Sequence, residues 1–138
     1  MTVAHFGFTK LVVHDLDRQA GFYGTVFGLT EMARVSAAVN ERAIDEIIYQ
    51  PTATGGATFV LWKWRDRDDA PGDGVILGFQ VESADATVAG AIAAGGTIVE
   101  TPRDQPDYGV RVGFVADPEG NLIEIVQITG AWAAQQPG

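Results

Sequence analysis

The sequence contains no cysteine, which excludes disulfide bridges, thiolate nucleophiles and cysteine-ligated zinc. It is also poor in positive charge, because 9 Lys and Arg stand against 18 Asp and Glu, for a net charge of −9. That acidic excess repels a phosphate backbone and an anionic membrane surface, so we expect no nucleic-acid and no membrane partner. No apolar run is long enough to span a membrane, and residues 1–10 lack the pattern of a signal peptide. We therefore expect a cytoplasmic protein.

The 138 residues, of which 46% are hydrophobic and 20% charged, suit one globular core. Hydrophobic periodicity and turn residues predict the same order of elements twice: a strand, a helix and three strands. The first series is a strand at 8–13, a helix at 18–27 that Asp15 or Asp17 caps and Gly28 ends, and strands at 30–37, 44–50 and 58–64, with 38–42 ambiguous. The second is a strand at 75–81, a helix at 84–94 that Ser83 or Asp85 caps, strands at 97–100, 110–115 and 122–128, and a loop at 101–109.

A charged segment rich in Gly and Pro, residues 66–74, separates the two series. Asp17 and Asp85 lie 68 residues apart, which supports an internal repeat (85 − 17 = 68). We therefore predict an α+β fold of two βαβββ modules, residues 4–65 and 74–129, and a flexible tail at 130–138. Each sheet is expected to curl around a shared concave space, with the helices on the outer faces.

Three segments, HDLDRQAGFYGTVFGL (14–29), GFQVESADATVAGAIAAGG (78–96) and VRVGFVADPEGNLIEIVQ (110–127), resemble the vicinal oxygen chelate superfamily. This is the glyoxalase/bleomycin resistance protein/dioxygenase family. The resemblance implies two βαβββ modules that form a cup, and pairing as homodimers or fused modules. It also implies a small-molecule ligand, with isomerase, lyase, epimerase or dioxygenase chemistry, or sequestration of antibiotics.

Enzymes of that family usually hold a divalent metal at four strand positions, which the resemblance carries to Phe8, Leu61, Ile76 and Glu124. Three of these side chains are apolar, and a catalytic divalent ion needs about three protein ligands. We therefore expect no metal and no other cofactor. Of the two histidines, His5 points away from Phe8 in a regular strand, although a bulge would reverse that, and His14 is expected in solvent.

Side-chain alternation along strands predicts the lining of the cup, with Glu124 directed inward. Trp62 and Trp64 are then expected to pack under a helix. The predicted lining is apolar at Phe8, Val12, Phe59, Leu61, Ile76, Leu122 and Val126, and polar at Lys10, Gln80 and Glu124, with Tyr49, Arg103 and Tyr108 at the mouth. Such a pocket is typical of a small-molecule site.

A carboxylate walled by apolar groups is poorly solvated, and a Glu shifted toward neutrality can serve as a general acid or base. Glu124 is therefore a candidate catalytic residue, unless it pairs with Lys10 and has a structural role. Three functions follow: a metal-independent isomerase or lyase acting on a small apolar carbonyl compound; a non-catalytic protein that binds and sequesters an antibiotic or metabolite; and, ranked last, a metal-dependent glyoxalase or dioxygenase with a displaced site. A substitution of Glu124 distinguishes the first two.

Overall fold

The computed structural model describes residue 3 and residues 6–67 and 75–130 of the chain. These residues divide into two units, Met1–Gly24 with Gly28–Pro71 and Thr25–Phe27 with Gly72–Gly138, which are described separately below. Of the tail predicted at 130–138, all but Gly130 lies outside the described residues, as does His5. No described helix has the length and apolar character needed to cross a membrane.

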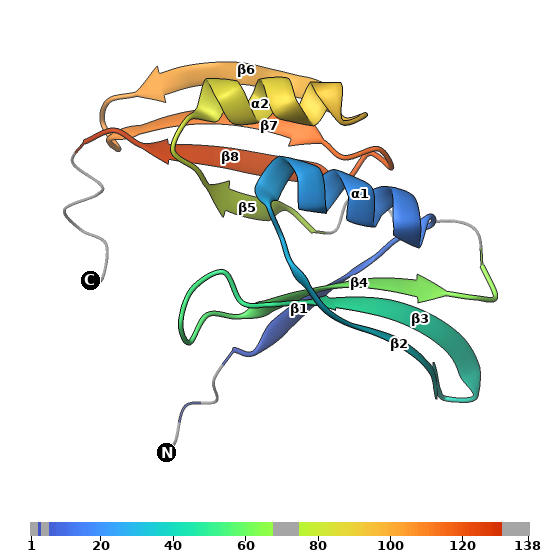
Figure 1. Cartoon of the computed structure of the whole chain (residues 1–138). Helices are drawn as coiled ribbons and strands as arrows, with labels where there is room; N and C mark the ends of the chain where they lie inside the picture. Colours follow the sequence, from blue (N-terminus) through green and yellow to red (C-terminus); the bar gives the residue numbers. More distant parts are fainter. Residues whose placement is uncertain (1–2, 4–5, 68–74, 131–138) are drawn as a thin grey trace. The chain divides into compact units, whose positions relative to one another are not determined.

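The first unit contains a four-stranded sheet, sheet 1, in the order β1-β4-β3-β2 (Figure 1). β1 is parallel to β4, and the other pairs are antiparallel. The elements are β1 (Phe8–Val12), α1 (Leu16–Phe27), β2 (Glu31–Val39), β3 (Arg42–Tyr49) and β4 (Thr58–Trp64), of which only the end of α1, Thr25–Phe27, is grouped with the second unit. Asp15 caps α1 by accepting a hydrogen bond from the Arg18 amide, and Gly28 ends the helix with a φ of 67°.

The residues left ambiguous at 38–42 form a tight hairpin between β2 and β3. Asn40 and Glu41 have φ values of 51° and 64°, which is the left-handed backbone that a two-residue hairpin turn requires. Asn tolerates this conformation well, whereas Glu seldom adopts it. Of the two turn residues, only Asn40 is of a type that indicates such a turn in a sequence. Both strands are longer than predicted.

The second unit contains sheet 2, in the order β5-β8-β7-β6. Its elements are β5 (Leu77–Gln80), α2 (Ala84–Ala93), β6 (Thr97–Gln105), β7 (Val110–Ala116) and β8 (Leu122–Ile128), and Ser83 caps α2. The predicted loop at 101–109 is wrong for its first five residues, which continue β6. Pro102 indicated a loop, but an edge strand tolerates proline, and the pairing of β6 with β7 is irregular on both sides of Glu100. The βαβββ order is confirmed in both halves.

One face of each sheet is turned toward a helix. In sheet 1 the centroid of the Phe59 ring lies 5.3 Å from that of the Tyr23 ring in α1. Arg34 forms an ion pair with Asp17 of the same helix. In sheet 2 the Gln127 side chain accepts a hydrogen bond from the Ala84 amide at the start of α2. We call the opposite face the distal face of each sheet. Alternation places Lys10, Glu46 and Trp62 on the distal face of sheet 1 and Glu124 on that of sheet 2.

Candidate functional site

Glu124 lies in the middle of β8, on the distal face of sheet 2. Its neighbours across the strands are Gly78 on β5 and Phe114 on β7. Within the described part of the chain the half-buried carboxylate has no hydrogen bond or ion pair. A Cβ added at Gly78 would meet no atom within 4 Å. Among the described residues the carboxylate is thus unpaired, with Phe114 on the neighbouring strand on one side and open space beside Gly78 on the other.

The predicted alternation along β8 is confirmed. Ile123 and Ile125 are fully buried on the side of α2, while Leu122 and Val126 are half-buried on the side of Glu124. Gln80 pairs with Val126 at the end of β5 and is exposed. Ile76 precedes β5 and is 58% exposed, so its side chain does not wall the carboxylate as closely as predicted.

Lys10 is the centre of a cluster on the distal face of sheet 1. Its Nζ atom lies 2.9 Å from Glu46 Oε1, 4.4 Å from the centroid of the Trp62 ring and 5.4 Å from that of Phe8. The Lys10 side chain is 35% exposed and the Glu46 side chain 11%. Lys10 therefore has Glu46 as its ionic partner, whereas sequence reasoning had considered Glu124 for that role.

A second cation and a second indole continue this face. The rings of Trp62 and Trp64 meet edge to face with centroids 5.2 Å apart. The Arg42 guanidinium lies 3.9 Å from the Trp64 ring and forms an ion pair with Asp66. The Nε1 atom of Trp62 is buried and has no hydrogen-bond partner among the residues described.

The prediction that Phe59 and Leu61 share a face with Phe8 and Lys10 is wrong. The register of β1 and β4 sets Lys10 beside Val60, and Leu61 is fully buried. Phe59 contacts Tyr23 of α1, so both residues belong to the helix side of sheet 1. A shift of one position along a strand exchanges its two faces. The prediction that Trp62 and Trp64 pack under a helix is therefore also wrong, because both lie on the distal face. Val12, which pairs with Trp62, keeps its predicted orientation.

The three residues predicted at the mouth have different surroundings. Tyr49 is 1% exposed, and its ring stacks on that of Phe59 with the centroids 5.9 Å apart. It therefore belongs to the core of the first unit and does not lie at an opening. Burial raises the pKa of the Tyr49 hydroxyl to about 12. Tyr108 is 67% exposed just beyond β6, and Arg103, on β6, borders a shallow hollow of about 370 Å³ with Ile98 and its neighbours.

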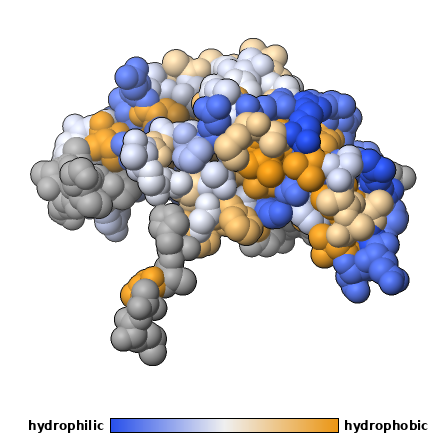
Figure 2. Space-filling view, turned by 60° about the horizontal axis from the view of Figure 1, so that its bottom comes forward, coloured by the Kyte–Doolittle hydropathy of each residue, from blue (hydrophilic) through white to orange (hydrophobic). Residues whose placement is uncertain are grey.

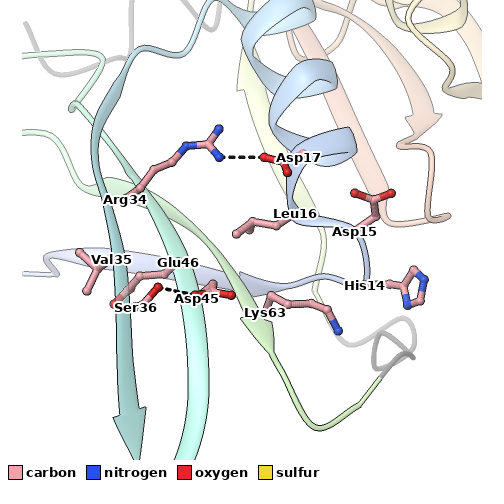
Figure 3. A pocket seen from close by; sticks show the side chains of 10 residues that line it. All are labelled: His14, Asp15, Leu16, Asp17, Arg34, Val35, Ser36, Asp45, Glu46 and Lys63. Carbon is pink, nitrogen blue, oxygen red and sulfur yellow. Dashed lines mark hydrogen bonds and ion pairs between the residues drawn. The ribbon is translucent and has the colours of Figure 1, made fainter.

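A larger hollow, of about 530 Å³, lies between the start of α1 and strands β2, β3 and β4 of sheet 1 (Figure 3). Several of its ionic groups already have partners. Arg34 bonds to Asp17 inside the hollow, and hydrogen bonds from Arg65, which lies outside it, and from Ser36 lower the pKa of Asp45 to about 2. Sequence reasoning missed this hollow, because three strands, one helix and the residues that precede the helix contribute to it without any motif. Its lining is His14, Asp15, Leu16, Asp17, Arg34, Val35, Ser36, Asp45, Glu46 and Lys63.

Apolar residues also remain at the surface, where Figure 2 shows them among charged ones. Phe8 is 57% exposed, so its ring is accessible on the face that carries Lys10. An exposed aromatic ring beside a charged group is a common component of ligand sites.

Comparison with known proteins identifies the family. The model of the Glyoxalase/Bleomycin resistance protein/Dioxygenase superfamily matches residues 2–125. The chain belongs to this superfamily. It is 26% identical over 120 residues to a "Probable lactoylglutathione lyase" of Vibrio cholerae, covering 86% of this chain and 87% of that protein.

Solved structures of superfamily members have the same fold. A glyoxalase family protein from Bacillus cereus superposes with a TM-score of 0.78 at 17% identity, over 94% of this chain and 97% of that one. A glyoxalase/bleomycin resistance protein from Albidiferax ferrireducens superposes with a TM-score of 0.65 at 26% identity, over 90% and 98%. The predicted fold of two βαβββ modules is therefore confirmed.

The divalent metal that the family implies does not fit the side chains that the structure describes. At the family's ligand positions Phe8 and Ile76 offer no lone pair, and Leu61 lies on the helix side of sheet 1. Within residues 6–67 and 75–130 no three His, Asp or Glu side chains lie together in a group that could hold an ion. Of the four ligand positions, only Glu124 has a side chain that can bind a metal ion, and one carboxylate does not make a tight site.

Proposed function

We propose that this chain is a metal-independent enzyme of isomerase or lyase type that acts on a small, largely apolar carbonyl compound, with Glu124 as the acid–base group. The observation that supports it is the half-buried carboxylate of Glu124 on the distal face of sheet 2, which has no hydrogen bond or ion pair with any residue in 6–67 or 75–130. A general base must reach the substrate proton directly, and a carboxylate already held by an ion pair would have to break that bond first. A Cβ at the neighbouring Gly78 would meet no atom within 4 Å, which leaves open space on that side of Glu124.

The chemistry that suits such a group is proton transfer next to a carbonyl. Glu124 takes the proton from the carbon beside the carbonyl, and the electron pair of the broken C–H bond forms an enolate. With an α-hydroxy ketone this enolate is an enediolate: return of the proton to the former carbonyl carbon, with transfer of the hydroxyl proton to the former carbonyl oxygen, gives an isomer. Return of the proton to the other side of the same carbon gives an epimer. The exposed Gln80 amide, on the adjacent strand, is a candidate donor to the substrate oxygen. The similarity to a named lactoylglutathione lyase favours this class of reaction.

Glu124→Gln tests the proposal, because it keeps the shape of the side chain and removes the base. Exchange of the carbon-bound proton is followed by NMR in heavy water, with methylglyoxal plus glutathione and a panel of α-hydroxy ketones as substrates. We expect wild-type exchange with at least one compound, and a loss of about 100-fold or more in the variant, as for removal of a general base. Binding of the reactive compound should change little. Equal rates for the two proteins contradict the proposal.

Two controls accompany this experiment. Glu100→Gln makes the same chemical change at an exposed position of β6 and should leave the exchange rate unaltered. Treatment with a chelator should also leave it unaltered, since no step uses an ion. A rate that falls with chelation and returns with a divalent metal contradicts the metal-independent part of the proposal.

A second candidate is a non-catalytic protein that sequesters a small molecule. The cluster of Lys10, Trp62 and Phe8 on the distal face of sheet 1 favours it, because aromatic rings beside a charge are well suited to binding and supply no base. Saturable binding of a panel compound without any proton exchange would support this alternative. In both cases we expect a cytoplasmic homodimer, and light scattering during size-exclusion chromatography measures the oligomeric state.

A further inference from the structure

We propose that the distal face of sheet 1 carries a separate binding site, an aromatic and acidic cage for an alkylated ammonium ligand, and that Lys10 occupies this cage when the ligand is absent. The ammonium group of Lys10 lies over Trp62 at 4.4 Å and near Phe8 at 5.4 Å, with Glu46 at 2.9 Å. Rings that face a cation, together with a carboxylate, are the groups by which proteins recognise quaternary ammonium ions.

The walls of the cage are held more firmly than its occupant. Trp62 is 8% exposed and the Glu46 side chain 11%, and both belong to the two inner strands of sheet 1. Lys10 lies on β1 at the edge of that sheet, and its side chain is 35% exposed. Its flexible stem can carry the charge outward into water, and the Glu46 carboxylate, only 11% exposed, is then left for an incoming cation to neutralise. The cage can therefore empty without rearrangement of the sheet.

The charge and hydration of the competing cations favour an alkylated ligand. A primary ammonium is a compact and strongly hydrated charge, which gains much from returning to water. A quaternary ammonium is more weakly hydrated and presents methyl groups to the rings. The net charge of −9 also raises the local concentration of cations. The site lies entirely within sheet 1 and does not depend on Glu124.

Titration with choline tests the proposal, with the indole N–H resonance of Trp62 as the probe at constant ionic strength. We expect saturable shifts of this resonance in the wild-type protein. Lys10→Ala removes the tethered competitor and should lower the dissociation constant for choline about tenfold, because affinity scales with the fraction of empty cages. Lys10→Gln, which keeps a side chain without charge, should also bind more tightly than wild type and serves if Lys10→Ala is unfolded.

Matched controls separate the cage from general attraction of cations. The uncharged carbon analogue of choline should cause no saturable shift. Arg42→Ala removes the other cation that lies over an indole and should leave choline binding as in wild type. Glu46→Gln in the Lys10→Ala background should weaken binding several-fold. The proposal is overturned if folded Lys10→Ala binds choline no better than wild type, or if the analogue binds equally well.

Discussion

Tyr49 buries a hydroxyl that has no hydrogen-bond partner among the described residues. Its ring stacks on Phe59, so the aromatic part is well packed while the oxygen is not satisfied. An unsatisfied buried polar group costs about 1–3 kcal/mol in the free energy of unfolding. This position was predicted at the mouth of a cup, but it belongs to the helix side of sheet 1.

Tyr49→Phe should therefore stabilise the protein by about 1 kcal/mol near neutral pH, as measured by urea unfolding. The gain should grow at alkaline pH. The pKa of this hydroxyl is raised from 10.0 to about 12 in the folded chain, so an unfolded chain ionises first as the pH rises between these values. The wild type loses stability in that interval, and the variant lacks this loss. A variant less stable than wild type near neutrality would indicate a partner for the hydroxyl.

The orientation of Glu124 was predictable, whereas that of Leu61 was not. In β8 the charged Glu124 stands between the apolar Ile123 and Ile125. This contrast shows which residues of the strand face the core and which face away from it. In β4 the residues from Phe59 to Trp62 are all apolar, so the sequence does not show which of them face the helix side of the sheet. The face of each residue in β4 then depends on its register with β1 and β3, which the sequence does not state.

Among the elements, β7 meets the irregular part of β6 at Gly113. A Cβ added there would lie 3.0 Å from Pro102 Cγ and 3.3 Å from the carbonyl oxygen of Glu100. The absent side chain thus allows the two strands to approach where their register shifts. Sequence reasoning saw Pro102 as the end of a strand because it could not anticipate this close approach.

Gly113→Ala should destabilise the protein by about 1–3 kcal/mol, as overpacking does. Gly90→Ala is the matched control, because Gly90 lies inside α2 and a Cβ there meets nothing within 4 Å. It should stabilise by about 0.5–1 kcal/mol through helix propensity. Chemical unfolding of both variants measures the two effects, and destabilisation by Gly90→Ala would show that the space beside this helix is filled.

The first turns of the two helices show a further regularity at this scale. Asp17 of α1 pairs with Arg34, and Asp85 of α2 pairs with Arg111. The spacing of these two acids in the sequence supported the repeat, but the arginines could not be foreseen. They come from strands that do not correspond in the two modules, β2 in one and β7 in the other.

At the scale of the whole molecule, the chain contains two units, each with its own sheet and core. The repeated βαβββ order was predictable, because the elements of each series are encoded in its own stretch of sequence. The cluster around Lys10 was not predictable in the same way, since the contact with Glu46 requires the pairing of β1, β4 and β3 in one register.

Hydrogen exchange should therefore reveal two slowly exchanging cores. We expect the most protected amides in β3 and β4 of sheet 1 and in β7 and β8 of sheet 2, because these strands are paired on both sides. The edge strands β2 and β6 should exchange faster. Exchange measured by NMR at constant pH tests this, and amides of β6 as slow as those of β8 would contradict it.

The irregular edge of sheet 2 has a consequence for solubility. β6 exposes Ile98 and Val99, and an edge strand with such residues can recruit strands from other molecules and start a fibre. The shifts in the register of β6 break the regular row of donors and acceptors along this strand. The irregular register that hid the end of β6 from the sequence pattern should therefore also reduce the pairing of this edge with strands of other molecules.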